Sequence, residues 1–575
     1  MTARFVDRTP DDPHPGSPRR PYRYLYLAVA LSALPFLALA RAEFIGFDAF
    51  WHVFIARQDT WYAFWDEIHR NAHPPVFYLA LKAAIAALGS NPIAYRVIPV
   101  AASLGSAWLV GRIVQRTAGH PWLPAIAAFT FGTSLTTVTL GLEVRAYALA
   151  TFLMLWATLA LCDLVEPSSA APRPRARAVF ALAASLALLT HYAASLFFLS
   201  CCVTAAVLAL VDREHRRRFL SQGRRHWPAN LLTFGVPLAV LAIEYGVHIG
   251  SWRGRIHHLS SFMFDAQREG VLEFVWRNTR ALFSLFAPAS HHRPFASTLL
   301  VAEPGLPGWA VDLLVASFLA AVGWLALTPS RRNGSAGTAR RIPPILLLAM
   351  TVLLVALALL GRYPYGGWLR HQSFLFPFLV IVLALAVDEI VRRTNRRIGG
   401  FAVWLFALAS LLNTANWVSH FQITRGHLMQ RPMNRFRELF PAPEAVYVDQ
   451  FNLIHMFTHH RHWQWRFVHR LQGGRELDVW RVSQTGSREF YVCRDRKQWL
   501  LDFSRPLTYR HLRGCLDAAG AERVVVFRTQ QPRRTPSWPV AQAEELAARE
   551  APLAGLVPDT VVVSGDDLYA AFTRR

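Results

Sequence analysis

The stretch AIAAFTFGTSLTTVTLGLEVRAYALATFLMLWATLALC, residues 125–162, decides the fold class. Two long apolar runs flank one short turn, and the only charged residues in the stretch, Glu143 and Arg145, lie in that turn. Uncharged apolar runs of about 17–25 residues are typical of helices that cross a membrane. The stretch therefore predicts two membrane-spanning helices joined by a tight polar turn.

The same pattern recurs over most of the 575 residues, of which 53% are hydrophobic, with a mean hydropathy of +0.23. We expect a polytopic all-α membrane protein with about eleven transmembrane helices. The predicted spans are 24–40, 92–114, 121–140, 146–163, 178–190, 191–211, 229–248, 308–328, 343–361, 371–391 and 399–417.

The net charge of +24 raises the question of a nucleic-acid partner. The basic residues, however, lie in six short clusters, at 19–23, 111–116, 173–177, 212–219, 331–341 and 392–397. Alternate threading of the spans places all six on the side of the N-terminus, as the positive-inside rule requires of cytoplasmic loops. We therefore expect a multi-pass protein of the cytoplasmic (inner) membrane, with a cytoplasmic N-terminus, an extracytoplasmic C-terminus and no nucleic-acid partner.

Three regions follow from this threading. They are a cytoplasmic disordered tail at 1–23, a membrane domain at 24–417 with outer loops at 41–91 and 249–307, and an extracytoplasmic domain at 418–575. Short apolar runs in the last region predict a small α/β domain. Its expected strands are 445–451, 488–493, 523–529 and 560–565, and its expected helix is 538–550.

The outer side of the protein holds two cysteines and one aromatic segment that suggest specific structures. Cys493 and Cys515 would lie in an oxidising compartment, where a disulfide between them is plausible. In the first outer loop, aromatic residues recur at helical spacing from Phe50 to Ile68, which predicts a helix lying flat on the outer leaflet. No cysteine spacing is typical of a zinc site, and the histidine-rich THHRHW at 458–463 could bind a metal but is more typical of a solvated loop. We therefore expect no metal or other cofactor, although a divalent metal stays possible.

Several polar residues gather at the outer mouth of the predicted bundle. Taken singly, each has a structural explanation, such as a solvated acid, a local charge pair, an interior histidine or an anchoring arginine. Their shared side is what indicates a site, because ionisable groups at such a depth are costly. The candidates are Asp48, His73, Glu143, Arg145, Tyr147, His191, Tyr192, Arg370 and His371.

The residue types suit sugar transfer from a lipid phosphate. A carboxylate can act as general base toward an acceptor hydroxyl, and arginine or histidine can bind a phosphate and stabilise it as a leaving group. The chain has no G-x-x-x-x-G-K-[ST], no G-x-G-x-x-G and no D-x-D. A nucleotide-driven pump and a transferase that uses a nucleotide sugar are therefore disfavoured.

Over residues 24–417 the chain resembles the membrane glycosyltransferases of the GT-C superfamily. The likeness is to bacterial relatives of the protein O-mannosyltransferases (glycosyltransferase family 39) and to the lipid A aminoarabinose transferase. The matching motifs are Asp48 after the first span, HPPVFY at 73–78, EVRAY at 143–147, Thr190 to Tyr192, and RHQSFLFP at 370–377. The chain departs from the pattern at Ala49, where that family commonly has a second acid.

The resemblance implies an inverting transfer from a polyprenyl-phosphate sugar to a lipid, glycan or protein acceptor. Asp48 would be the general base, and Glu143 the second acid of the site. Arg145, Arg370 and His371 would contact the donor phosphate, and His73 and His191 would shape the pocket, with Tyr147 and Tyr192 beside them in the matching motifs.

Two other functions stay open. A transporter or flippase of lipid-linked sugars would have ionisable groups inside several spans and discontinuous helices. A catalytically inactive sensor or scaffold is consistent with the loss of an acid at Ala49.

Overall fold

The structure is a computed structural model of the 575-residue chain. It describes residues 20–40, 47–71, 73–165, 174–211, 227–248, 263–283, 300–301, 308–327, 336–366, 369–420, 422–423, 427–448, 450–460, 462–470, 477–484, 488–495, 512–529, 555–564 and 567–574.

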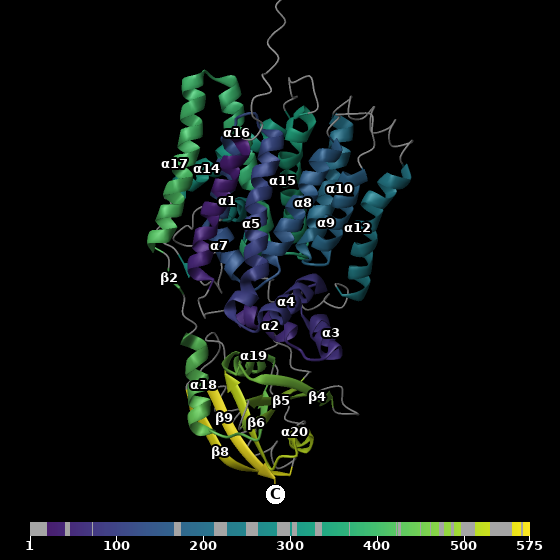
Figure 1. The fold of residues 1–575 in the computed structure, drawn as a ribbon, viewed down its shortest axis with the longest axis vertical. Coiled ribbons are helices and arrows are strands. Elements are labelled where there is room, and N and C mark those ends of the chain that lie inside the picture. Colours follow the sequence, from purple (N-terminus) through teal and green to yellow (C-terminus); the bar gives the residue numbers. More distant parts are fainter. Residues whose placement is uncertain are drawn as a thin grey trace, which may run out of the picture.

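A bundle of long helices forms the upper part of the molecule in Figure 1. It comprises α1 (Arg20–Leu39), α5 (Pro92–Thr117), α6 (Leu123–Gly132), α7 (Leu135–Leu142), α8 (Tyr147–Val165), α9 (Pro174–Leu188), α10 (Ala193–Val211), α12 (Trp227–Val247), α14 (Gly308–Leu327), α15 (Ala336–Leu359), α16 (Phe376–Arg393) and α17 (Arg396–His420). A 3-10 helix, η4 (Leu369–Leu375), leads into α16, and α13 (Val271–Leu282) lies between α12 and α14 in the chain.

Helices lie at all eleven positions where the sequence predicts spans. Eight of the helices in the described residues are long and apolar enough to cross a membrane, and α6 with α7 makes a ninth candidate. The described side chains of α14 give a shorter apolar helix, 312–327, and α9 has only 15 residues. Among these candidate spans, the segment that contains α16 is the most buried, at 72% of the residues in its apolar stretch. In α12 the buried share is 17%. Most of the surface of α12 is therefore exposed in the structure, as expected of a helix that faces lipid.

The predicted span 121–140 is not one straight helix. Its two halves, α6 and α7, meet at an angle of 53°. Ser134 begins α7 as its N-cap, because its Oγ accepts a hydrogen bond from the backbone N–H of Thr137 at 3.1 Å. At its other end α7 stops at Leu142, and Glu143 is the C-cap, whose backbone N–H donates to the carbonyl of Thr139.

Three short helices lie beneath the bundle in Figure 1: α2 (Phe47–Ala56), α3 (Trp61–Arg70) and α4 (Pro75–Leu88). The prediction of one surface helix on the lipid is wrong for α2, where Phe50 and Phe54 are buried. The ring of Phe54 meets the rings of Phe457 and Trp480 at 5.1 and 5.5 Å. These aromatic residues face protein, because burial against a second protein surface satisfies an apolar face as well as lipid does.

The C-terminal sheet region, residues 427–574, holds a seven-stranded sheet in the order β4-β5-β6-β3-β7-β9-β8. Its strands are β3 (Ala445–Val448), β4 (Gln464–Arg470), β5 (Leu477–Gln484), β6 (Arg488–Asp495), β7 (Arg523–Thr529), β8 (Leu556–Ser564) and β9 (Asp567–Arg574). Its helices are α18 (His427–Leu439), α19 (Gln450–His459) and α20 (Leu512–Ala519), and a two-residue pair, β1 (Leu300–Val301) with β2 (Gln422–Ile423), lies just before it.

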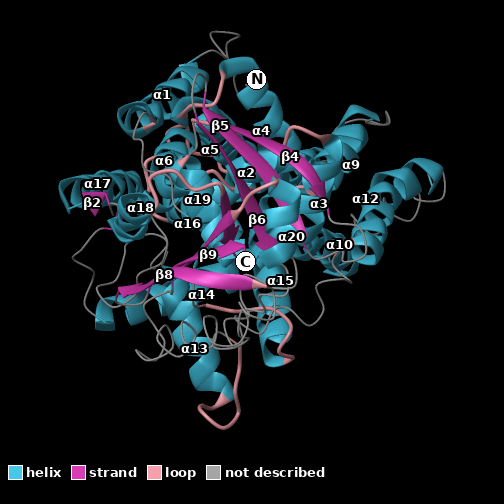
Figure 2. Cartoon of the chain, turned by 90° about the horizontal axis from the view of Figure 1, so that it is seen from below, coloured by secondary structure: helices cyan, strands magenta, loops and turns pink. Residues whose placement is uncertain are grey.

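Strand β3 is the centre of this sheet and runs parallel to β6 and β7, while the other pairs are antiparallel. All four of its residues are buried, as expected of a strand covered on both faces. The four predicted strands are present, and the predicted helix at 538–550 lies outside the described residues. Seen from below, the strands lie across the helices α2, α4 and α19 (Figure 2).

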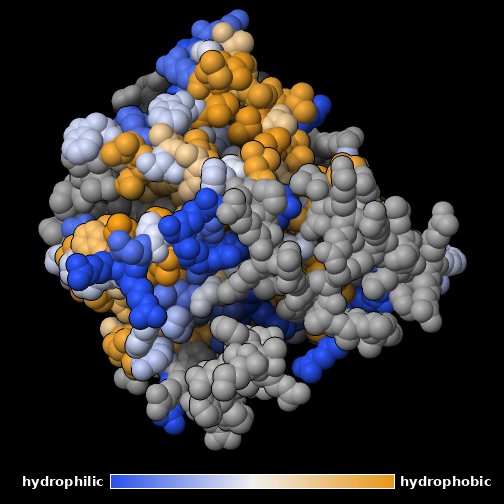
Figure 3. Space-filling model, turned by 90° about the horizontal axis from the view of Figure 1, so that it is seen from above, coloured by the Kyte–Doolittle hydropathy of each residue, from blue (hydrophilic) through white to orange (hydrophobic). Residues whose placement is uncertain are grey.

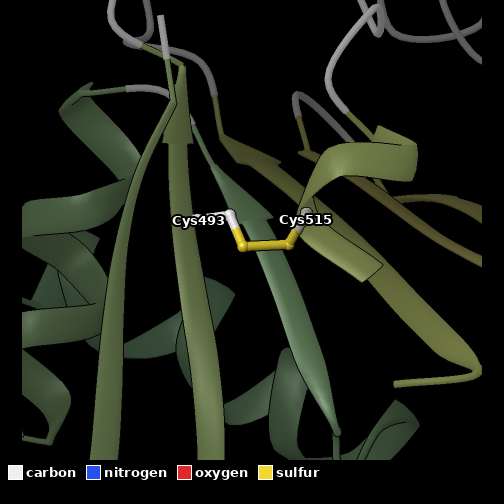
Figure 4. The surroundings of a disulfide bond; sticks show 2 residues. All are labelled: Cys493 and Cys515. Carbon is white, nitrogen blue, oxygen red and sulfur yellow. A yellow bond between two sulfur atoms is a disulfide. The ribbon is translucent and has the colours of Figure 1, made fainter. Parts of the chain in front are cut away.

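One face of the sheet and the α2–α4 segment share a single hydrophobic core. The other face packs on α20, and there the predicted disulfide joins Cys493 of β6 to Cys515 (Figure 4). The sheet is thus held on one side by the segment under the bundle and on the other by a covalent bond.

The opposite end of the bundle is shown in Figure 3, where hydrophilic residues lie among apolar ones. Exposed arginines there include Arg392 and Arg393 at the end of α16 and Arg396 at the start of α17. The sheet region lies at the other end of the bundle, where α7 meets α8.

Candidate active site

The predicted site residues with described side chains lie in four turns at the end of the bundle that faces the sheet region. His73 precedes α4, Glu143 and Arg145 join α7 to α8, His191 and Tyr192 join α9 to α10, and His371 lies in η4. Tyr147 is the first residue of α8. The backbone N–H of Val76 donates to the carbonyl of Leu189 at 2.9 Å, which ties the His-Pro-Pro turn to the α9–α10 turn.

A cluster of rings forms around His73. Its ring centroid lies 5.0 Å from that of His191, 5.2 Å from that of His52 and 6.0 Å from that of Tyr147. Tyr147 is in turn 4.9 Å from His191 and 6.4 Å from His371. Five residues from five separate parts of the sequence therefore meet here, and we call this group the ring cluster.

Two predicted residues have side chains outside the described part of the structure. Asp48 lies in the first turn of α2, four positions before His52, and positions four apart share one face of a helix. Arg370 lies in η4 beside His371. Their backbones thus lie next to members of the ring cluster, and their roles stay proposals.

Sequence reasoning missed two members of the site. His52 stacks on Tyr78 with centroids 5.2 Å apart, and both side chains are buried. The spacing of His52 from Asp48 was a usable signal, since it is one helical turn. Tyr78 lies within the HPPVFY motif, but only the fold shows that its ring turns toward His52.

The Glu143–Arg145 turn is held from both sides. The backbone N–H of Arg145 donates to the carbonyl of Glu143 at 2.8 Å. The buried Arg96 donates from Nε to the carbonyl of Leu142 at 3.1 Å and from Nη1 to that of Ala40 at 2.7 Å. Arg96 thereby satisfies a carbonyl at the end of α7, which would otherwise lack a partner.

Arg145 brings a fixed positive charge to the ring cluster. Its side chain is 8% exposed, and its guanidinium carbon lies 5.0 Å from the centre of the Tyr147 ring. Burial, followed by the charges of neighbours that include His191, holds the pKa of His73 well below its ordinary value. Burial and then Arg145 lower the pKa of His191 to about 3. Both imidazoles are therefore neutral at physiological pH, beside a permanent cation.

The tautomer of His191 follows from its neighbour. The backbone N–H of Ala193 donates to Nδ1 of His191 at 3.0 Å, and a nitrogen that accepts cannot carry the proton. The proton of the neutral ring is thus on Nε2. His191 can therefore offer a hydrogen bond from Nε2 to a ligand.

Three buried polar atoms of the site have no hydrogen-bond partner in the described part of the chain. They are Nδ1 of His73 and the hydroxyls of Tyr78 and Tyr147. Buried polar groups are nearly always paired, so each such atom calls for an explanation. A polar ligand bound in the ring cluster would supply the partners.

The described residues hold one acidic group with spacing suited to a metal ion. Ligand oxygens of Asp66, Glu67 and Asp478 lie within 4.8 Å of one another. Arg494 donates to Glu67 at 3.1 Å and to Asp478 at 2.5 Å, and Arg70 donates to Asp66 at 3.0 Å. The two guanidinium groups therefore already bind these carboxylates, and the geometry does not call for a cation.

Comparison with solved structures shows that the chain shares its overall fold with ArnT. No family model matches the chain, and no curated protein matches it in sequence. The similar solved structures include ArnT from Cupriavidus metallidurans bound to undecaprenyl phosphate, with a TM-score of 0.52 and 13% identity over 96% of this chain and 98% of that one. The structure of the same protein in the apo state has a TM-score of 0.51 and 12% identity, again over 96% of this chain and 98% of that one.

An oligosaccharyltransferase from Archaeoglobus fulgidus, in complex with Zn and sulfate, is also similar. Its TM-score is 0.46, with 13% identity over 95% of this chain and 73% of that one. The predicted fold class, a helical membrane bundle with a small C-terminal α/β part, is confirmed by the likeness to ArnT. At these identities the likeness concerns the fold.

Proposed function

We propose that this protein is an inverting glycosyltransferase that moves a sugar from a polyprenyl-phosphate donor to an acceptor hydroxyl at the outer face of the cytoplasmic membrane. The observation that carries the proposal is the ring cluster, in which Arg145 and two neutral histidines meet at one end of a membrane bundle. The ArnT fold supports it, since that protein is known with undecaprenyl phosphate bound.

The donor phosphate would bind to the donors of the cluster. The guanidinium of Arg145 offers a charge-assisted hydrogen bond, and His191 offers one from Nε2. Because His191 is neutral, it adds a donor without adding a second charge. Arg370 and His371, from η4, would complete the phosphate contacts. These groups would stabilise the negative charge that the phosphate gains as it leaves.

The acceptor would be activated by an acid of the site. Asp48 would take the proton of the acceptor hydroxyl, and the oxygen's electron pair would form the new bond to the anomeric carbon. The bond from that carbon to the phosphate oxygen breaks, and its electron pair leaves on the phosphate. Glu143, held at the end of α7, would orient the acceptor or the base. One displacement of this kind inverts the anomeric centre.

One observation favours the transporter as a second candidate. The break between α6 and α7 is a discontinuous helix, and a small cavity beside it is lined by hydroxyl side chains that include Ser103, Thr136 and Ser373. A transporter would move lipid-linked sugars across the bilayer without cleaving the bond to phosphate.

The test uses the full-length protein, purified in detergent. It is offered a panel of radiolabelled polyprenyl-phosphate sugars with a membrane extract as acceptor. We expect transfer by wild type, a loss of at least a hundredfold for Asp48→Asn and for Glu143→Gln, and full activity for Asp163→Asn. Asp163 is the matched control, because it pairs with Arg116 near the opposite end of α8.

Each result separates the candidates. Transfer by wild type but not by a folded Asp48→Asn establishes the enzyme and its base. Equal transfer by the two removes Asp48 from the mechanism. Movement of labelled donor across the bilayer of a proteoliposome, with no cleavage, would establish the transporter instead.

A further inference from the structure

The hydroxyl of Tyr192 has a partner that controls what else it can bind. Tyr192 follows His191 in the α9–α10 turn, and its phenol is hydrogen-bonded to Nδ1 of His248 at the end of α12. Its position is beside the site, since it directly follows His191, whose ring lies 5.0 Å from that of His73.

The other nitrogen of His248 fixes the direction of this hydrogen bond. Nε2 lies 3.2 Å from the carbonyl oxygen of Ile68, and a carbonyl oxygen can only accept. Nε2 must therefore carry a proton. Burial is the main cause that lowers the pKa of His248, so the ring holds one proton at neutral pH and Nδ1 has a free electron pair. The phenol of Tyr192 is then the donor.

Of the other described neighbours of His248, the backbone of Asn71 favours a proton on the ring, as the carbonyl of Ile68 does. The nearest carboxylate oxygen of Glu244 is 4.0 Å from Nδ1 and can only accept while ionised. The ring of His69 is 5.9 Å away, and its Nδ1 is already hydrogen-bonded to the carbonyl of Trp65 at 2.8 Å. Burial and then the charge of Glu244 raise the pKa of Tyr192, so its phenol keeps the proton that it donates.

A phenol has one proton. Since His248 holds it, the oxygen of Tyr192 can only accept a hydrogen bond from a ligand. The phosphate of a phosphodiester donor carries acceptor oxygens and no proton at neutral pH, so it cannot bind there. A sugar hydroxyl can, because it has a proton to donate.

We propose that Tyr192, oriented by His248, recognises a hydroxyl group of the transferred sugar and not the donor phosphate. The inference rests on the proposed function and narrows it. Arg145 and His191 would hold the phosphate, and the adjacent Tyr192 would read the sugar attached to it. Tyr192 is then a specificity-determining residue, and His248 is the positioning residue that sets its proton.

The test compares analogues of whichever polyprenyl-phosphate sugar the wild type uses. One set lacks a single hydroxyl, and a matched set has fluorine in its place. Each analogue is measured as a competitive inhibitor, so that effects on the rate of bond cleavage do not enter. Fluorine can accept a hydrogen bond weakly but cannot donate one. A hydroxyl read by Tyr192 must donate, so both analogues at that position should bind about tenfold more weakly than the parent donor.

The variants then assign the penalty to Tyr192. In Tyr192→Phe we expect the parent donor to bind about tenfold more weakly and the two analogues to bind as before, so the penalty disappears. Binding of sugar-free polyprenyl phosphate should be unchanged. His248→Gln keeps an acceptor oxygen for the phenol and should retain part of the penalty, whereas His248→Leu should lose it. Tyr62→Phe, on the exposed face of α3, is the control.

Several results would overturn the inference alone, given a wild type that transfers sugar. One is that no single-hydroxyl analogue is penalised, and another is that Tyr192→Phe keeps the penalty. A fluorinated analogue that binds like the parent would make Tyr192 a donor. Weaker binding of polyprenyl phosphate to Tyr192→Phe would make it a phosphate contact. If wild type transfers no sugar from any donor, the proposed function itself is wrong.

Discussion

Arg494 of β6 and Glu67 of α3 form an ion pair across 427 residues of sequence, and neither side chain is exposed by more than 2%. The same guanidinium also binds Asp478 of β5. Burial alone would lower the pKa of Arg494, but the two carboxylates outweigh it and raise the pKa above its ordinary value. The sheet region is therefore fixed to α3. That helix ends at Arg70, three residues before His73 of the ring cluster.

Removing the charge of Arg494 should weaken this attachment strongly. Arg494→Met leaves two buried carboxylates without their cation, and breaking a buried pair in this way costs about 3–5 kcal/mol. The Tm of the solubilised protein would report the loss. Arg481→Met is the matched control, because its partner Glu489 and Arg481 itself are 41% and 47% exposed, and a surface pair contributes about 0–1 kcal/mol. Equal Tm values for the two variants would contradict the buried pair.

Arg145→Lys tests the phosphate contact. Lysine keeps the charge but loses the planar, multi-donor guanidinium that lies on the Tyr147 ring. We expect the Kd for polyprenyl phosphate to rise about tenfold to a hundredfold, as expected for a hydrogen bond to a charged group. The Kd is measured on the full chain in detergent. Arg116→Lys, in an exposed pair with Asp163, should leave it unchanged, and an unchanged Kd for Arg145→Lys would remove Arg145 from the phosphate site.

Stability should fall in acid because of the buried histidines. The folded-state pKa of His191 is about 3, below the ordinary value of about 6.5, so the unfolded chain binds a proton that the folded chain does not. The contribution is complete above pH ~6.5 and is lost toward pH ~3, at about 1.4 kcal/mol per pH unit for each such group. Burial also lowers the pKa of His73, so its contribution to stability is lost in acid in the same way.

The measurement is Tm against pH between 8 and 5. Carboxylates add their own slope, so the informative quantity is the difference between variants. We expect a shallower acid fall for His191→Asn than for wild type. Leu88→Ala, at an exposed side chain that does not titrate, should keep the wild-type slope. A slope for His191→Asn as steep as that of wild type would mean that His191 is protonated in the fold.

The positions of the helices and strands could be predicted because hydropathy is a local property. Apolar runs mark the bundle, and the run around Val446 marks a strand buried on both faces. The break in the span 121–140 also had a local signal, since Gly132 and Ser134 lie inside an apolar run and serine favours the N-cap position. The nearly unbroken apolarity of the run outweighed that signal.

Relations between distant segments could not be predicted. Phe54 was expected to face lipid, and the same apolar ring instead packs on Trp480. Nothing near Glu67 in the sequence indicates Arg494, since their contact depends on how the sheet packs under the bundle. In the site, the motifs indicated His73 and His191, but the pairing of His52 with Tyr78 appears only when α2 meets α4. Patterns with a short period predict elements, and tertiary packing decides their partners.

The disulfide gives the last prediction, because it has a separate chemical readout. Only Cys162, Cys201 and Cys202 are free, so the denatured, non-reduced protein should label at three thiols and the reduced protein at five.

The disulfide should also contribute to stability together with the ion pair of Arg494. Replacing both cysteines, Cys493→Ala with Cys515→Ala, removes a link between residues 22 apart, which we expect to cost about 3 kcal/mol of the free energy of unfolding, chiefly by freeing the unfolded chain. Because Arg494 follows Cys493 directly, the loosened strand is the one that binds Glu67. The Tm of Cys493→Ala/Cys515→Ala/Arg494→Met should therefore fall by less than the sum of its parts, and strict additivity would show that the disulfide and the ion pair act independently.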